Sequence, residues 1–292
     1  MLRAGHHALA GRAFDLAQTL AGTLAYDAVE ARVWLDLAEA ELALHAGDPL
    51  RFLNLTELAA ESFRVRGDQR NACLCRADMG HAFQLLGAFA RAERELRAAV
   101  TIAERLKLGF LAPARTNLGF VLARLGRLRE GAATVDDALQ RCLDQGYGRL
   151  VAECQLHLAE VLRLSGELHE AEVFAEQALT GSANQPAVRA ASLAMLAGVL
   201  LDQGRSAEAL ERSSEAMEIL VTLPDAGEGE ILIRMAHVRA LAANGHLATA
   251  RAHLVETRER VSMLAALITD PRWLQTFLEA IPENRAAREL LS

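Results

Sequence analysis

Apolar residues recur along the chain at the spacing of an α-helix, in blocks that are separated by short polar turns. Runs of alternating Val, Ile and Thr that would predict strands are missing. A glycine follows one block in each pair, and these glycines are Gly47, Gly87, Gly126, Gly166, Gly204 and Gly245. Their separations of 40, 39, 40, 38 and 41 residues predict a repeating helix–turn–helix unit.

The residues after these glycines keep the same register. The fifth residue after each glycine is Phe52, Ala92, Gly131, Ala171, Ala209 or Ala250, and the twelfth is Ala59, Ala99, Ala138, Ala178, Ala216 or Thr257. Small residues at these offsets let two helices cross at the short end of their usual separation. The glycine ends the first helix by taking a left-handed conformation that is costly for other residues. We therefore expect helical hairpins that bury their second face by stacking on their neighbours.

Three segments carry this pattern most clearly: TNLGFVLARLGRLREGAATVDDAL, LHLAEVLRLSGELHEAEVFAEQAL and LAMLAGVLLDQGRSAEALERSSEAM. They resemble tetratricopeptide repeats, strongly over residues 71–256 and in part over 28–64. The period of about 40 residues exceeds the family's usual one of about 34. This longer form resembles the repeats of cytoplasmic bacterial regulators and kinesin light chains. The resemblance implies an all-α fold, a right-handed superhelical solenoid of about six helical hairpins.

The repeat continues through the longer connections, so we expect a single tetratricopeptide-like solenoid domain over residues 1–292. A partial repeat (1–27) precedes the predicted repeats 28–69, 70–108, 109–148, 149–185, 186–226 and 227–269. Asp270 and Pro271 begin a predicted C-terminal capping helix in 270–292 that covers the open end of the stack. Its phrase FLEAIPEN resembles the ending of the C-terminal repeat regions of multidomain bacterial signalling kinases and ATPases.

Charge and cysteine usage narrow the partners and the compartment. The net charge of −7 argues against direct nucleic-acid binding, which needs a basic footprint. The chain lacks an apolar run of about 18 residues, so we expect no membrane partner. Arg3 and Arg12 interrupt the segment where a signal peptide would be apolar. The four cysteines lack CxxC spacing and suit the reduced thiols of a cytoplasmic protein.

Sequence motifs for catalysis are missing. The patterns GxxxxGK[ST], GxSxG and HExxH do not occur. His246 and His253 lie seven residues apart with a predicted turn beside them, and Cys73 and Cys75 face different directions on a helix. We therefore expect a protein that is not an enzyme, with no catalytic residues, no cofactor and no metal.

The resemblance also implies where a partner binds, because first helices of tetratricopeptide hairpins line a concave groove. Carried over by register, the groove residues of this chain are Asp78, His81, Asn117, Phe120, Arg124, His157, Glu160, Arg163, Met195, Leu201, Met235 and Arg239. The middle of this set is polar, and its C-terminal part is apolar. Flexible methionines suit adaptable binding surfaces, although the same spacing is typical of plain core.

The sequence therefore favours a protein–protein interaction or scaffolding module that binds a peptide or partner protein, with a regulatory role in bacterial signalling. The alternative is a ligand- or peptide-sensing domain of a cytoplasmic regulator. A deep apolar pocket would favour sensing, and a long open groove would favour protein binding. The oligomeric state stays open at this point.

Overall fold

The computed structural model describes residues 7–23, 28–108, 111–223 and 229–290, and every regular element in these ranges is a helix. The helices are α1 (His7–Thr23), α2 (Ala28–His45), α3 (Pro49–Val65), α4 (Gln69–Leu85), α5 (Phe89–Arg105), α6 (Leu111–Arg124), α7 (Leu128–Asp144), α8 (Gly148–Ser165), α9 (Leu168–Gly181), α10 (Pro186–Asp202), α11 (Ser206–Leu220), α12 (Glu230–Ala243), α13 (Leu247–Ala266), α14 (Pro271–Glu279) and α15 (Pro282–Glu289).

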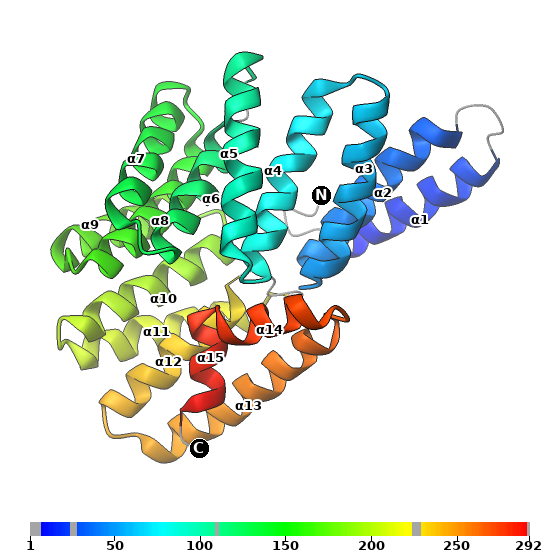
Figure 1. Cartoon of the computed structure of the whole chain (residues 1–292). Coiled ribbons are helices and arrows are strands. Elements are labelled where there is room, and N and C mark those ends of the chain that lie inside the picture. The colour runs from blue at the N-terminus through cyan, green and yellow to red at the C-terminus, as the bar shows by residue number, and fades with distance from the viewer. Residues whose placement is uncertain (1–6, 24–27, 109–110, 224–228, 291–292) are drawn as a thin grey trace.

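From α2 to α13 the helices form hairpins that stack on one another (Figure 1). Each even-numbered helix packs against the odd-numbered helix that follows it, and that helix packs against the next hairpin. The first helices of neighbouring hairpins also touch, namely α4 with α6, α6 with α8, α8 with α10 and α10 with α12. These five helices therefore form the inner layer of the stack. The predicted all-α superhelical solenoid of helical hairpins is confirmed.

The repeat glycines end the first helices as predicted. All six have positive φ angles, between 71° at Gly87 and 81° at Gly126 and Gly166. After α8 the amide of Gly166 donates to the Arg163 carbonyl at 3.1 Å, and the amide of Glu167 donates to the Leu162 carbonyl at 3.0 Å. This pair of hydrogen bonds satisfies carbonyls at the helix end and turns the chain into the next helix.

The small residues lie where the two helices of a hairpin cross. Ala171, Ala178, Ala209 and Ala216 are fully buried. At the α6–α7 crossing a Cβ atom on Gly119 would stand 2.7 Å from the carbonyl oxygen of Gly131, closer than real Cβ contacts come. The backbones approach so closely because neither residue has a side chain.

The C-terminal segment differs from the expected single capping helix. It forms two helices, because Pro282 disfavours helical geometry at Ile281, which has an extended backbone (φ −81°, ψ 113°). Neither helix continues the stack. The chain turns back toward the N-terminal hairpins, so that α14 lies below the lower ends of α4 and α5 in Figure 1, and α15 packs against α12 and α13.

One core cluster joins the two ends of the solenoid. It contains buried side chains of α2–α6 together with side chains of α12–α15. At the turn between α2 and α3, a Cβ atom on Gly47 would stand 2.9 Å from a methyl carbon of Leu264 on α13. The two ends of the solenoid therefore pack together. The C-terminal segment contacts α12 and α13 of the last hairpin and also packs against the N-terminal hairpins.

At the N-terminal end, α1 packs against α2. The rest of the predicted partial repeat, residues 1–6 and 24–27, lies outside the described residues. Among the described helices, none combines the length and hydropathy that crossing a membrane requires.

Candidate partner-binding surface

A cluster of aromatic and charged side chains occupies the inner face at α6 and α8. The ring centroids of Phe120 and His157 lie 5.3 Å apart in an edge-to-face arrangement. The guanidinium carbon of Arg124 lies 4.9 Å from the centroid of the Phe120 ring. Phe120 therefore contacts a cation on one side and an imidazole edge on the other, two contacts that favour an aromatic face.

Arg124 is also the centre of a buried ion-pair group. Its guanidinium pairs with Glu160 on α8 and, at 3.2 Å, with Glu283 in the first turn of α15. The side chains of Arg124 and Glu160 are only 11% and 10% exposed, so water screens this pair weakly. The Nε atom of Arg124 is buried without a hydrogen-bond partner among the described residues.

The pKa values of this group reflect burial and mutual charge. Burial acts to lower the pKa of Arg124, but Glu160 and Glu283 outweigh it, so the pKa lies above its ordinary value. Burial raises the pKa of Glu160, and the nearby Arg124 opposes that rise. Arg124 therefore keeps its positive charge, and Glu160 and Glu283 are the carboxylates that pair with it.

A second ion-pair group continues the inner face across α8, α10 and α12. Arg163 donates to Asp202 at 2.6 Å, and Arg239 lies 3.4 Å from the other carboxylate oxygen of Asp202. A Cβ atom on Gly198 would stand 3.4 Å from the Nε atom of Arg163, an ordinary contact distance, so the Arg163 side chain lies against α10 at this residue. The side chains of Asp202 and Arg239 are 30% and 44% exposed, which leaves them accessible to a partner.

Other predicted groove residues lie apart from these two groups. Asp78 and His81 are half-buried on α4, where the His81 ring packs edge-on against Phe52 at 6.1 Å. Asn117 is half-buried on α6, and Leu201 is half-buried at the end of α10.

The predicted apolar part of the groove requires a correction. Met195 and Met235 are 1% and 3% exposed and belong to core clusters, so they do not form an open patch. Met195 packs among side chains of α8, α9, α11 and α12, whereas Met235 packs in the cluster that joins α2–α6 to α12–α15. The residues that the sequence did not indicate are Asp202 and Glu283, whose partners lie 39 and 159 residues away.

The described residues offer little for catalysis. They contain no group of three or more His, Cys, Asp or Glu side chains placed to hold a metal ion. All four cysteines are buried, and burial raises the pKa of the Cys75 and Cys154 thiols to about 12. Ser213 and His237 lie 3.1 Å apart, but the Ser213 hydroxyl is fully buried between α11 and α12.

Comparison with known proteins agrees with the repeat architecture. Residues 110–183, which include α6–α9, match the sequence model described as tetratricopeptide repeat. No curated protein matches the chain by sequence.

Solved structures share the fold over most of the chain. A Rap protein complexed with Competence and Sporulation Factor matches with a TM-score of 0.68 at 9% identity, covering 94% of this chain and 79% of that one. The Rap conjugation gene regulator of plasmid pLS20, in complex with the Phr* peptide, matches with a TM-score of 0.66 at 16% identity, covering 90% and 77%. NprR in complex with its cognate peptide NprX matches with a TM-score of 0.63 at 12% identity, covering 91% and 74%. Residues 110–183 therefore carry tetratricopeptide repeats, and the chain shares its solenoid fold of helical hairpins with these solved structures.

Proposed function

We propose that the protein is a non-catalytic interaction module that binds a peptide or partner protein against the inner face of its solenoid. In this proposal it acts as a regulatory or scaffolding component of bacterial signalling. The buried free cysteines suit the reducing conditions of the cytoplasm, which is the compartment we propose.

The observation that carries the proposal is the row of polar and aromatic side chains on successive inner helices. Phe120 and Arg124 on α6, Arg163 on α8, Asp202 on α10 and Arg239 on α12 are distant in sequence, and stacking aligns them along one face. A row of donors and acceptors on a preformed scaffold fits an extended peptide or a helix better than a single small molecule.

The structural neighbours support a peptide as the first class of partner to test. The three similar structures contain, by their descriptions, Competence and Sporulation Factor, the Phr* peptide and the peptide NprX. At 9–16% identity these proteins share the fold with this chain, so the peptide sequence has to be found by experiment.

Site-specific photocrosslinking tests the proposal. A photoreactive amino acid replaces Arg239 on the inner face, and the same amino acid replaces Glu211, an exposed outer residue of α11, as the matched control. We expect the Arg239 position to crosslink a defined protein or peptide in cells and the Glu211 position not to do so. The proposal fails when the outer position captures the partner and the inner position does not.

A second measurement separates binding from folding. Arg163→Ala with Arg239→Ala removes both cations from Asp202, and it should weaken capture of that partner while the melting temperature falls by no more than about 4 °C. Substitutions at partly exposed ion pairs of this kind change stability by about 1 kcal/mol or less. Glu211→Lys is the outer control, because Glu211 is exposed on α11.

A further inference from the structure

The two C-terminal helices are attached to the solenoid by different kinds of contact. α14 is attached by apolar and aromatic contacts to the turn between α4 and α5. The rings of Trp273 and Phe83 lie 5.4 Å apart, and the guanidinium carbon of Arg91 lies 5.3 Å from Phe83 and 6.0 Å from Trp273. The Thr276 hydroxyl donates to the Leu86 carbonyl at 2.7 Å. α14 is therefore an anchor that holds the segment in place.

α15, by contrast, is held mainly by polar contacts. Its sequence, PENRAARE, has only Asn284 and Ala287 buried. Glu283 pairs with Arg124 at its N-terminal end. At its C-terminal end Arg258 of α13 donates to the carbonyl of Ala287 at 2.7 Å, and also to those of Arg288 and Leu290. Because little apolar surface is buried, α15 gains little from the hydrophobic effect.

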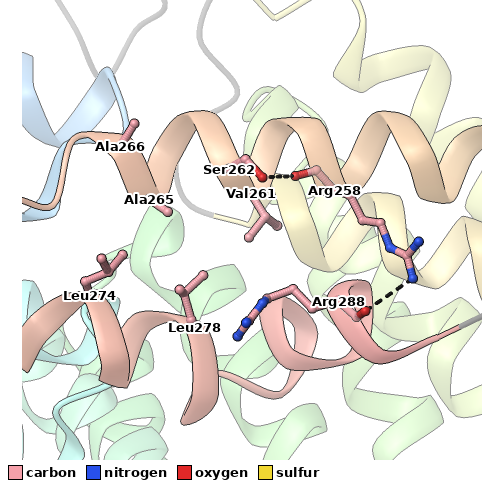
Figure 2. A pocket seen from close by; sticks show the side chains of 8 residues that line it. All are labelled: Arg258, Val261, Ser262, Ala265, Ala266, Leu274, Leu278 and Arg288. Atoms are coloured by element: carbon pink, nitrogen blue, oxygen red, sulfur yellow. Dashed lines mark hydrogen bonds between the residues drawn. The ribbon is translucent and has the colours of Figure 1, made fainter. Parts of the chain in front are cut away.

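An open depression remains between α13 and the C-terminal helices. It has a volume of about 610 Å³ and its apolar lining comes from Val261, Ala265, Ala266, Leu274 and Leu278. Figure 2 shows Leu274 and Leu278 of α14 facing Val261 and Ala265 of α13, with Arg258 and Arg288 at one end. The α15 helix lies beside this depression and does not fill it.

We propose that α15 occupies the binding site of a partner helix, and that the partner is an acidic amphipathic helix that displaces α15. A carboxylate of the partner pairs with Arg124 in place of Glu283, and apolar side chains of the partner enter the depression between α13 and α14. The proposal rests on the proposed function, since it names the partner class and the regulation of the same inner face. α14 stays on the α4–α5 turn, and the chain moves at Ala280–Pro282.

Charge and shape both favour this occupant. Arg124 is a cation that donates hydrogen bonds, so a carboxylate is a favourable partner for it, and burial reduces the screening of that pair by water. A partner with Leu or Phe side chains would bury apolar surface that α15 leaves open to water. Because α15 is covalently linked to the solenoid, its effective concentration at this binding site is high. A free helix therefore competes only when it binds the site more tightly than α15 does, or when the contacts of α15 are weakened.

The test uses the full chain and a synthetic peptide of residues 280–290 as the probe. Binding of the labelled peptide is measured by fluorescence anisotropy to the parent chain and to Glu283→Gln, which weakens the internal contact. We expect the peptide to bind Glu283→Gln at least about tenfold more tightly than the parent, because a charge-assisted hydrogen bond has about this strength. The same peptide with Gln in place of Glu283, and with Glu289 unchanged, should bind the Glu283→Gln chain about tenfold more weakly than the unaltered peptide does.

Two controls keep the test decisive. Glu279→Gln makes the same chemical change on an exposed residue of α14 and should leave peptide binding at the parent level. Amide hydrogen exchange of 282–290 should become faster in Glu283→Gln and stay unchanged in Glu279→Gln, while α8 and α9 exchange as in the parent. This readout detects release of α15 even where the peptide binds weakly.

The outcomes separate this inference from the proposed function. The inference is overturned when Glu283→Gln changes neither the exchange of α15 nor the binding of the peptide. It is also overturned when the partner found by crosslinking binds the parent and Glu283→Gln equally, a result that leaves the proposed function intact. Failure of the Arg239 position to crosslink any partner contradicts the proposed function instead.

Discussion

The hairpins from α6 to α11 and the closure made by α14 and α15 are two regions of one molecule that are stabilised differently. In the hairpins each helix packs on its neighbours in sequence, through alanines and glycines that are fully buried. In the closure, the contacts join residues 159 and 190 positions apart, and several are single polar bonds. The comparison teaches that the stack is specified by contacts between neighbours in sequence, whereas the closure depends on contacts between residues that are distant in sequence.

A change in the stack should have the largest effect. Ala216→Trp places an indole at a fully buried site among Leu193, Leu220 and Ile233. We expect overpacking to destabilise the fold by about 3 kcal/mol, measured by chemical denaturation. Glu211→Trp, on the exposed side of the same helix, should melt like the parent. Equal stability of Ala216→Trp and the parent would show that the helices do not cross here.

A change in the closure should have a smaller and more local effect. Trp273→Ala removes the half-buried ring that packs against Phe83, and we expect a loss of about 2 kcal/mol. Hydrogen exchange should increase in α4 and α5 and stay the same in α8 and α9. Uniform destabilisation of all repeats would contradict the separation of stack and closure.

Acidification should weaken the last hairpins before the middle ones. Burial, and then the charge of His253, lowers the pKa of His237 below the ordinary histidine value of about 6.5. The unfolded state therefore binds the proton more readily, so this contribution to stability is complete above about pH 6.5 and decreases as the pH falls below it. Melting temperatures measured between pH 7.5 and 5 should decrease, and His237→Gln should flatten the curve. A pH profile of His237→Gln that follows the parent would assign the loss to other groups.

The smallest expected effect concerns the turn between α5 and α6. Lys107 has a φ angle of 53°, whereas the corresponding turns after α3 and α7 use Gly67 and Gly146. A left-handed conformation costs a residue with a side chain about 1–2 kcal/mol, and glycine loses part of that gain through its greater freedom in the unfolded chain. We expect Lys107→Gly to stabilise the protein by roughly 0.5 kcal/mol in chemical denaturation. Lys107→Ala is the control and should give no gain.

The regularity of the stack could be predicted because it depends on neighbours in sequence. The six glycines, their left-handed turns and the alanines at the crossings each follow from the preference of a single residue type or from the packing of two adjacent helices. A solenoid of this kind has mainly contacts between neighbouring repeats, so the period of about 40 residues predicts most of its architecture.

The tertiary structure alone decided how the inner face is used. Small rotations between repeats add up along the stack and bring α13, α14 and α15 into contact with α2–α6. The total rotation cannot be predicted from the sequence pattern of a single repeat. The sequence placed Met195 and Met235 on the groove, whereas the structure buries Met195 among the repeats and Met235 in the cluster that the closure forms. Arg124 could be assigned to the inner face by its register, but its partner Glu283 could not, because the pair depends on closure across 159 residues.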